Sequence, residues 1–239
     1  MNDDFYFIIG LMSGTSLDGI DLVFVKFDKK NYKDFKILAA ETIAYSNAWK
    51  GKLQTAISFS KDDLIRLDIE YAVLLSEEIN QFIEKNKIDN IDFIASHGHT
   101  ILHQPAKGIT LHYKKSAPKS LGLEWVRLII FPLIDTLEKD IPTILRTFIE
   151  HAAIQIGKII HKNDIVLITG GGVFNDFLMN RIEFYAEQKI EIPSKALINY
   201  KEALIFAFLG LLRIENQVNC LKSVTGAKKD HSSGVIFNK

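Results

Sequence analysis

The 239-residue sequence lacks several features that mark whole classes of protein. Its single cysteine, Cys220, excludes an internal disulfide and is typical of a reducing compartment. Its 29 basic and 29 acidic residues balance, so no excess charge favours a nucleic acid or a membrane surface as partner. The longest strongly apolar run, 203–212, is too short to span a bilayer. Because Asp3 and Asp4 stand where a secretory signal would be basic, we expect a cytoplasmic protein.

What the sequence does contain is a polar loop between two apolar runs, 5–11 and 20–27. Both runs are rich in Ile, Val and Phe and hardly alternate, which predicts strands buried on both faces. Glycines in the loop let backbone N–H groups approach an anion, its hydroxyls add donors, and Asp18 or Asp21 can hold a hydrated magnesium ion. An ordinary long hairpin turn also favours Gly, Ser and Asp, but it needs fewer of them. We therefore interpret the hairpin as a phosphate-and-metal site.

The rest of the N-terminal part reads as a third strand, a long helix and a short strand. Residues 35–45 form the expected third strand. Ser60 with Asp63 is typical of a helix start, and apolar residues at helical spacing predict a helix over 61–86, followed by a strand at 91–96. The order βββαβ is typical of the opening of an RNase H-like domain.

The C-terminal part predicts alternating helices and strands after a basic connector, KKSAPKSLG. We expect helices at 123–137, 142–161, 175–188 and 201–216, and strands at 165–169 and 189–192. Three glycines, 170–172, lie between the first of these strands and the helix that follows it. They let a ligand approach the partial positive charge of a helix N-terminus, although a tight turn alone would also account for them.

Five motifs, in order, resemble those of one enzyme family. MSGTSLDGID, SHGHTILHQP, ITGGGVFN, KEALIFAFLG and SVTGAKKDHSSG are similar to motifs of the anhydro-N-acetylmuramic acid kinases, members of the actin-like ATPase and sugar-kinase superfamily. The resemblance implies an α/β fold of RNase H-like lobes. Residues 1–112 would form the first lobe, opening βββαβ, and residues 113–239 an incomplete second lobe, αβαβα.

The resemblance also implies a function and a set of site residues. The family converts 1,6-anhydro-N-acetylmuramic acid, ATP and water to N-acetylmuramate 6-phosphate and ADP, a step of peptidoglycan recycling. ATP and Mg²⁺ would be the cofactors and an amino sugar the partner, with no nucleic acid and no membrane; a homodimer is open to the chain. Asp18 would hold the magnesium through water, and Glu202 would contact the sugar. The expected nucleotide-binding residues are Gly14, Thr15, Ser16, Leu17, Asp18, Gly19, Ile20, Asp21, Gly170, Gly171, Gly172 and Asn175.

Part of the family's pattern has no counterpart in this chain. Near Tyr113 the end of the first lobe, the second phosphate motif and the stretch that supplies the aspartate base are missing. The catalytic residue is therefore unknown, and a nucleotide-binding protein without catalysis is an alternative.

Three histidines suggest a different class of protein. On a strand end, the spacing of His97 and His99 predicts that both lie on one side, where His103 could close a zinc site. A metallohydrolase is thus a second alternative. No Asp, Glu or Cys follows between His97 and Lys107, and the related family has glutamine at position 99, which both weigh against it.

Overall fold

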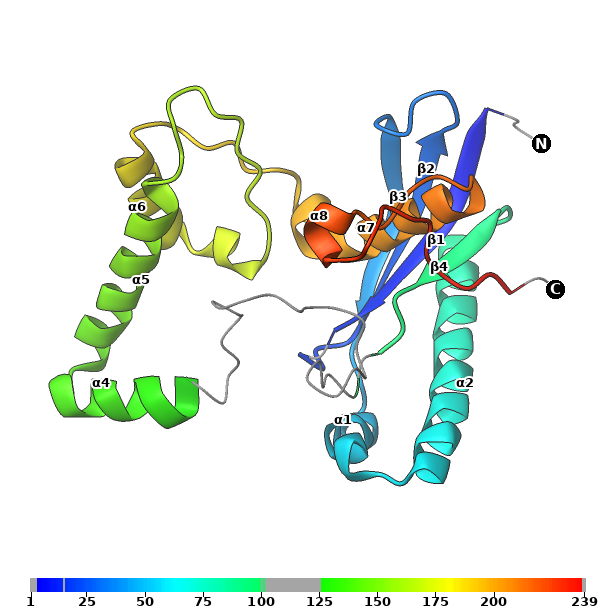
Figure 1. Ribbon diagram of the computed structural model, residues 1–239, viewed down its shortest axis with the longest axis horizontal. Coiled ribbons are helices and arrows are strands. Elements are labelled where there is room, and N and C mark those ends of the chain that lie inside the picture. The colour runs from blue at the N-terminus through cyan, green and yellow to red at the C-terminus, as the bar shows by residue number, and fades with distance from the viewer. Residues whose placement is uncertain (1–3, 15, 100, 102–125, 238–239) are drawn as a thin grey trace. The chain divides into compact units, whose positions relative to one another are not determined.

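The computed structural model describes residues 4–14, 16–99, 101 and 126–237. The chain forms two compact units, one of Met1–Lys114 with Tyr200–Lys239 and one of Lys115–Asn199 (Figure 1). Residues 200–239, which the resemblance placed in the second lobe, pack with the N-terminal unit.

The N-terminal unit is built on a four-stranded sheet in the order β3-β2-β1-β4. Strand β1 (Phe5–Ser13) pairs antiparallel with β2 (Ile20–Asp28), which pairs antiparallel with β3 (Phe35–Ile43). Strand β4 (Phe93–Ser96) lies parallel to β1. The predicted sequence of three strands, a helix and a fourth strand is confirmed, with ends that differ by a few residues.

Helix α2 (Lys61–Asn86) has the bounds that the sequence predicted. The Ser60 hydroxyl accepts a hydrogen bond from the Asp63 backbone N–H at 3.2 Å and donates one to the Asp63 carboxylate at 2.6 Å. Sequence reasoning missed the short helix α1 (Asn47–Thr55), which Ser46 caps in the same way, and the one-turn η1 (Ala56–Ser58) after it. A serine before a short amphipathic stretch was the available signal.

The two central strands are buried on both faces, as predicted. One face contributes Ile9, Leu11, Leu22 and Phe24 to a core that α2 completes with residues such as Phe82. The other face is covered by α7 (Lys195–Ile214), which has a kink at Tyr200. The apolar runs without alternation are therefore explained by a helix on each side of the sheet.

Two glycines bring α7 against the sheet. A Cβ on Gly10 of β1 would lie 2.2 Å from the Ala203 carbonyl oxygen, and one on Gly210 would lie 2.6 Å from the Ala95 Cβ. Such distances are shorter than any real contact, so only glycine permits this packing. The unit ends in α8 (Lys222–Thr225) and a tail that is held by an antiparallel bridge between Cys220 and His231 and by hydrogen bonds from Asn219 and Arg213.

In the second unit, the regular elements among the described residues are all helices, joined by irregular segments. It contains η3 (Val126–Ile130), α4 (Phe131–Leu137), α5 (Ile141–Gly157), the 3₁₀ turn η4 (Gly171–Phe174) and α6 (Asp176–Ala186). Helices α5 and α6 pack around a cluster of Ala153, Met179, Ile182 and Ile190. The predicted helices are confirmed here, each with somewhat different ends.

The two strands predicted for this unit, 165–169 and 189–192, are not formed. Neither segment enters a ladder of hydrogen bonds with another described strand. A strand exists only through its pairing, and the sheet of the structure lies in the other unit. The parallel pair that the sequence analysis predicted is therefore wrong. No helix among the described residues is long and apolar enough to cross a membrane.

Candidate functional site

The candidate site is the loop between β1 and β2. Its base is the pair Ser13 and Ile20, the last partners of the β1–β2 ladder. Leu17 takes a left-handed conformation with φ 58°, and its N–H donates to the Gly14 carbonyl at 3.3 Å. Gly19 passes so close to β3 that a Cβ there would lie 2.4 Å from the Ile43 carbonyl oxygen. The loop is thus anchored at its base, while Thr15 lies outside the described residues.

The tip of this loop presents unused polar groups. The backbone N–H groups of Ser16 and Asp18 donate to no other described residue. The Asp18 side chain is exposed and hydrogen-bonded to no described residue. Unpaired N–H groups attract an anion, and a free carboxylate beside them suits a hydrated divalent cation. The residues present therefore fit a phosphate group with magnesium.

Two further carboxylates lie at the same place. Burial raises the pKa of the half-buried Asp21 carboxyl; a hydrogen bond from the Thr42 hydroxyl at 2.6 Å opposes this, and the charges of Glu202 and Asp18 raise the pKa further. Glu202, on α7, thus lies close enough to the hairpin for its charge to raise the pKa of Asp21. The structure brings these predicted residues together from segments far apart in the sequence.

A buried polar cluster under the loop was missed by sequence reasoning. The Ser13 side chain is 1 % exposed and donates to the Gly98 carbonyl at 3.0 Å, while the hydroxyls of Tyr45 and Tyr71 lie 2.6 Å apart. Tyr45 also hydrogen-bonds Ser13. Burial and the bond with Tyr71 raise the Tyr45 pKa well above its ordinary range, and the bond with Ser13 opposes this rise. The cluster ties the start of the hairpin loop to the segment after β4.

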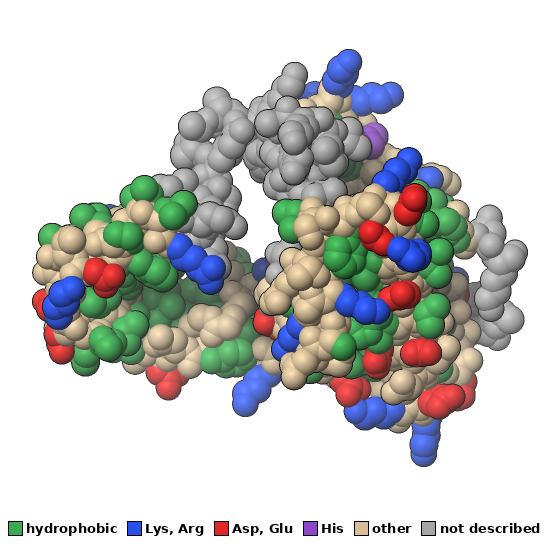
Figure 2. Space-filling view, turned by 90° about the horizontal axis from the view of Figure 1, so that it is seen from below, with side chains coloured by type: hydrophobic (Ala, Val, Ile, Leu, Met, Phe, Trp, Pro, Cys, Tyr) green, Lys and Arg blue, Asp and Glu red, His purple; other side chains and the backbone are tan. Residues whose placement is uncertain are grey.

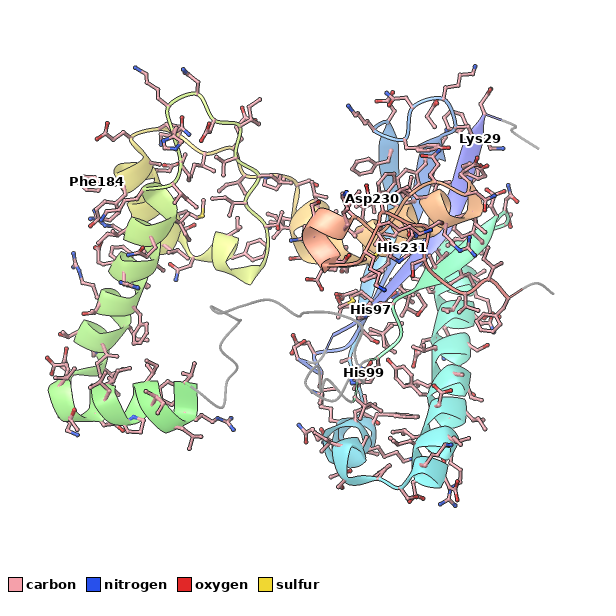
Figure 3. All side chains as sticks on the ribbon, in the orientation of Figure 1. Lys29, His97, His99, Phe184, Asp230 and His231 are labelled. Carbon is pink, nitrogen blue, oxygen red and sulfur yellow. The ribbon has the colours of Figure 1, made fainter. Side chains whose placement is uncertain are left out.

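The histidines do not form the zinc site considered above. The His97 ring packs on Phe206 of α7, with centroids 4.5 Å apart, whereas the His99 ring packs on Tyr71 of α2 at 5.9 Å (Figure 3). Gly98 between them has φ 72°, which breaks the strand alternation and sends the two rings to opposite faces. His103 lies outside the described residues, which contain no group of three potential ligands placed to hold a metal. The prediction that His97 and His99 lie on one side is wrong.

His99 is instead part of the polar cluster. Burial lowers the pKa of its imidazole, a hydrogen bond to the Ser13 backbone opposes this, and the charge of His97 lowers it further. Its Nδ1 is buried and has no hydrogen-bond partner among the described residues. A neutral imidazole is the form that this environment favours.

The glycines of the second predicted loop lie in the other unit. Gly170 has φ 92°, and a Cβ on Gly170 or Gly171 would meet no atom within 4 Å, so the loop is open to a ligand. Asn175 caps α6, its side-chain oxygen accepting from the Leu178 N–H at 3.0 Å. That oxygen is already engaged, so the amide N–H₂ is the part of the Asn175 side chain that remains available as a donor.

A pocket of about 510 Å³ lies away from these residues. It opens between the β2–β3 turn and α7, where Phe27, Tyr32, Phe35, Leu204 and Phe208 form its apolar walls. It shares no residue with the hairpin loop and contains no carboxylate, so it is not part of the candidate site.

Comparison with known proteins decides the family. A family model described as anhydro-N-acetylmuramic acid kinase matches residues 6–112 and 109–239, which together cover nearly the whole chain. The chain belongs to the anhydro-N-acetylmuramic acid kinase family. The two matched ranges meet at 109–112, where the sequence analysis found part of the kinase family's pattern to be missing.

Curated anhydro-N-acetylmuramic acid kinases are similar over part of their length. The Acinetobacter baylyi protein is 36% identical over 108 residues, 43% of this chain and 27% of the relative. The Mannheimia succiniciproducens protein is 34% identical over 143 residues, 53% of this chain and 38% of the relative. The Sulfurovum protein is 32% identical over 145 residues, 59% of this chain and 38% of the relative. These alignments span between about a quarter and two fifths of the kinases that they match.

Proposed function

We propose that this chain binds magnesium–ATP at the β1–β2 hairpin and serves the kinase reaction of its family. The reaction transfers the γ-phosphoryl group of ATP to the O6 of 1,6-anhydro-N-acetylmuramic acid, whose ring is opened by water. The product is N-acetylmuramate 6-phosphate, an intermediate of peptidoglycan recycling in the cytoplasm. The observation that carries the proposal is a hairpin with unpaired N–H groups and the carboxylates of Asp18 and Asp21, with Glu202 of α7 near them, in a member of this family.

In the N-terminal unit, different residues would bind the phosphates, the magnesium ion and the sugar. The N–H groups of Ser16 and Asp18 would bind phosphate oxygens, and the exposed Asp18 carboxylate would hold a magnesium ion through its water. Glu202 would accept hydrogen bonds from sugar hydroxyls. The bound cation neutralises charge on the β- and γ-phosphates. The sheet order and the helix on each face support an RNase H-like lobe.

The open loop at Gly170–Gly172 in the second unit would contact the nucleoside. Its backbone is unobstructed, and it immediately precedes α6, whose N-terminus carries partial positive charge. Asn175 would contribute only its side-chain N–H₂.

Calorimetric titration with ADP tests nucleotide binding, with and without magnesium. We expect Asp18→Ala to weaken magnesium-dependent binding by roughly tenfold or more, the usual effect of losing a residue that orders a metal's ligands. Binding without magnesium should change little. Asp89→Ala is the matched control, because Asp89 is exposed and lies outside the hairpin. Wild-type protein that binds no ADP, or an Asp18→Ala variant that binds as wild type does, would contradict the proposal.

A second candidate is nucleotide binding without catalysis. It is favoured by the short span of the relatives that the chain matches and by the missing counterpart of the family's aspartate base. A general base contributes about a hundred- to ten-thousand-fold to a rate, and one lost phosphate donor about a hundredfold or more. The acids that remain in the matched motifs, Asp18, Asp21 and Glu202, already have other roles in the proposal.

We therefore expect the chain to bind nucleotide but to phosphorylate the anhydro sugar at no useful rate. A coupled assay for ADP release tests this on protein whose intact mass matches 27.1 kDa. Turnover of about one per second or faster, the ordinary range of kinases, would show that residues of this chain supply the base.

A further inference from the structure

The apolar pocket of about 510 Å³ beside α7 has no part in the proposed kinase site. It opens between the β2–β3 turn and α7, where the turn and residues 204–212 of the helix belong to one compact unit (Figure 1). One wall is a face of α7, because Leu204, Ile205, Phe208 and Leu212 recur at three- and four-residue spacing. The volume lies within the range of small-molecule pockets, roughly 300–1,000 Å³.

The walls of this pocket are largely aromatic, and its mouth is open to solvent. The Phe208 ring packs on the buried Phe27 ring, with centroids 6.1 Å apart, and meets the Tyr32 ring edge-on at 6.4 Å. Phe35 and Ile205 are 42 % and 41 % exposed. Ring contacts within the protein thus fix the walls, and a ligand would bury the apolar area that remains at the mouth.

Lysines surround the mouth of the pocket. Lys30 and Lys33 line it, and a second hollow of about 360 Å³, which adjoins it at Lys33, adds Lys26 and Lys36. The ammonium groups of Lys33 and Lys36 make no ion pair with any described residue. Lys30 approaches Asp4 only to 3.8 Å, and both of these side chains are largely exposed. An anionic group at the mouth would therefore pair with ammonium groups that have no strong partner in the described chain.

The two carboxylates near these lysines are already engaged by the turn itself. Asp28 accepts hydrogen bonds from the backbone N–H groups of Lys30 at 2.7 Å and Asn31 at 3.0 Å, and Asp34 accepts one from the Asn31 side-chain amide at 2.8 Å. Both line the second hollow, and the described lining of the apolar pocket contains no carboxylate. The four lysines thus outnumber the two aspartates, so the charge here is positive in a chain without net charge.

We propose that this pocket binds a small amphipathic acid, a molecule with an alkyl or aryl body and one carboxylate. The body would lie against Phe208 and the α7 wall, and the carboxylate would lie at the mouth beside Lys33. Apolar walls with a few polar groups at one end are the usual form of a small-molecule site. A neutral apolar molecule would leave the lysines without a partner, and a nucleotide would have to bury several charges among phenylalanines.

Exposed apolar side chains of the second unit offer such a molecule a competing surface. Figure 2 shows hydrophobic side chains gathered on the part of the molecule that holds α4. Leu128, Phe131, Leu133 and Leu137 of η3 and α4 are each at least half exposed. None of these four lines the apolar pocket or the second hollow, so variants of the two regions distinguish the two locations.

Displacement of the fluorescent probe anilinonaphthalene sulfonate tests the binding on the full chain. Octanoate should displace the probe, and each methylene added from hexanoate to decanoate should tighten binding roughly threefold until the pocket is filled. Octanol has a comparable alkyl body without the charge and should bind about threefold more weakly than octanoate, the effect of a solvent-exposed ion pair. Amide chemical shifts that octanoate changes should belong to the β2–β3 turn and to residues 204–212 of α7.

Two pairs of variants separate the apolar contribution from the charged one. Ile205→Glu places a carboxylate in the α7 wall and should weaken octanoate binding by roughly tenfold or more. Ile214→Glu is its matched control, because Ile214 is 39 % exposed on the same helix but outside the pocket. Lys33→Gln should weaken octanoate binding by about threefold and leave octanol binding unchanged. Its control is Lys61→Gln, at an exposed lysine outside both hollows.

Each alternative has its own result. Wild-type protein that binds no octanoate would overturn the proposal, as would equal affinities for octanoate and octanol. Octanoate binding that survives Ile205→Glu but is lost in Leu133→Glu would assign it to α4. Binding to vesicles of phosphatidylcholine and phosphatidylglycerol without binding of dissolved octanoate would identify a membrane-docking surface and contradict a small-molecule site. None of these readouts uses a nucleotide or the anhydro sugar, so failure here is distinct from failure of the proposed kinase function.

Discussion

Two apolar runs of this chain have the same strand-like sequence pattern, but only one of them forms a strand. Residues 20–28 form β2, paired on both sides and covered on both faces, whereas residues 165–169 form no strand. Both are β-branched and apolar, so propensity does not separate them. The difference is the neighbour: β2 lies between β1 and β3, while no described strand lies beside residue 165. A run of β-branched and apolar residues thus shows that a segment can form a strand, and the presence of a neighbouring strand determines whether it does so.

The closed packing of the first unit gives the largest expected effect. Replacing Gly10 by alanine drives a methyl group into the backbone of Ala203, which belongs to a helix and yields little. We expect Gly10→Ala to lower the free energy of unfolding by about 3 kcal/mol, the upper end of ordinary overpacking. The matched control in the second unit is Gly171→Ala, where a Cβ meets nothing within 4 Å and the change should stay within about 0.5 kcal/mol.

Urea denaturation followed by circular dichroism measures both variants. If Gly10→Ala and Gly171→Ala lowered the free energy of unfolding equally, the packing around Gly10 would be no tighter than that around Gly171. An unchanged Gly10→Ala variant would mean that α7 does not press on the sheet in solution.

Local signals in the sequence predicted local structure well. Helix α2 begins at its serine cap and ends where predicted, because a cap and a 3.6-residue period are properties of the segment itself. The β1–β2 hairpin was also predictable, since two buried runs a short loop apart are each other's nearest partners. The candidate phosphate loop followed from the same short stretch.

Features that depend on tertiary contacts were not predictable from pattern alone. The buried cluster of Ser13, Tyr45 and Tyr71 joins three segments, none of which carries a signal for it. The strand pair of the second unit failed for lack of partners. The opposite directions of His97 and His99 follow from a left-handed Gly98, which a count of residues along a strand does not include.

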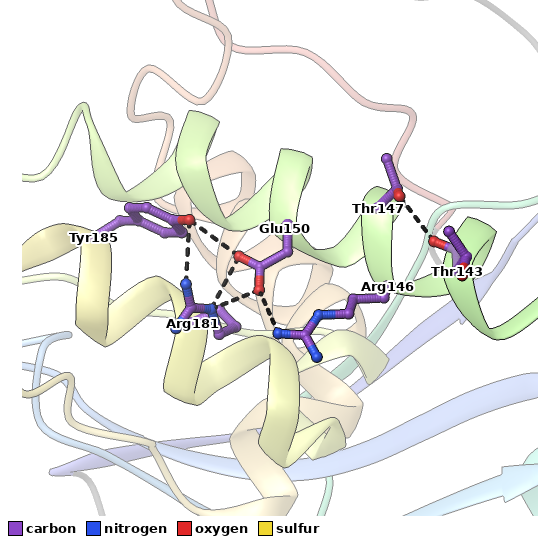
Figure 4. Close-up of polar contacts among 6 residues, drawn as sticks. All are labelled: Thr143, Arg146, Thr147, Glu150, Arg181 and Tyr185. Atoms are coloured by element: carbon purple, nitrogen blue, oxygen red, sulfur yellow. Dashed lines mark hydrogen bonds and ion pairs between the residues drawn. The ribbon is translucent and has the colours of Figure 1, made fainter.

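A polar clamp holds the helices of the second unit together, and its removal should give the next effect. Arg181 Nε donates to the Glu150 carboxylate at 2.9 Å, the Tyr185 hydroxyl donates at 3.1 Å, and Arg146 lies 3.8 Å away (Figure 4). Burial alone would raise the Glu150 pKa, but the bonds from Arg181 and Tyr185 and the arginine charges hold it below its ordinary value. We expect Glu150→Gln to destabilise this unit at neutral pH, by less than Gly10→Ala destabilises the other.

The pH dependence of stability in the acid range tests the contribution of the Glu150 clamp. Because the folded pKa of Glu150 is lowered, its contribution is present above the ordinary value of 4.5 and is lost as the pH falls through the folded pKa. Hydrogen exchange of α5 and α6 should show this loss in the wild type and in the control Glu191→Gln, an exposed glutamate, but not in Glu150→Gln. A wild-type and a Glu150→Gln curve of the same shape would exclude the clamp.

The smallest effect should appear at the candidate site, where the otherwise tightly packed first unit carries an unfavourable charge. Burial and the charges of Glu202 and Asp18 raise the folded pKa of Asp21 above its ordinary 3.8, although the Thr42 hydrogen bond opposes them. The stability that Asp21 gains by protonation is therefore complete below 3.8 and is lost as the pH rises through the folded pKa. Asp21→Asn keeps an acceptor for the Thr42 hydroxyl and removes the charge, so at neutral pH it should be slightly more stable than wild type.

Magnesium-dependent nucleotide binding should weaken in the same variant, because a cation at this hairpin offsets the repulsion that the asparagine abolishes. Thermal melting across the acid range, with calorimetry at neutral pH and Asp89→Asn as control, measures both quantities. A variant that is less stable at neutral pH and binds magnesium–nucleotide unchanged would place the bond from Thr42, and not charge, at the centre of Asp21's role.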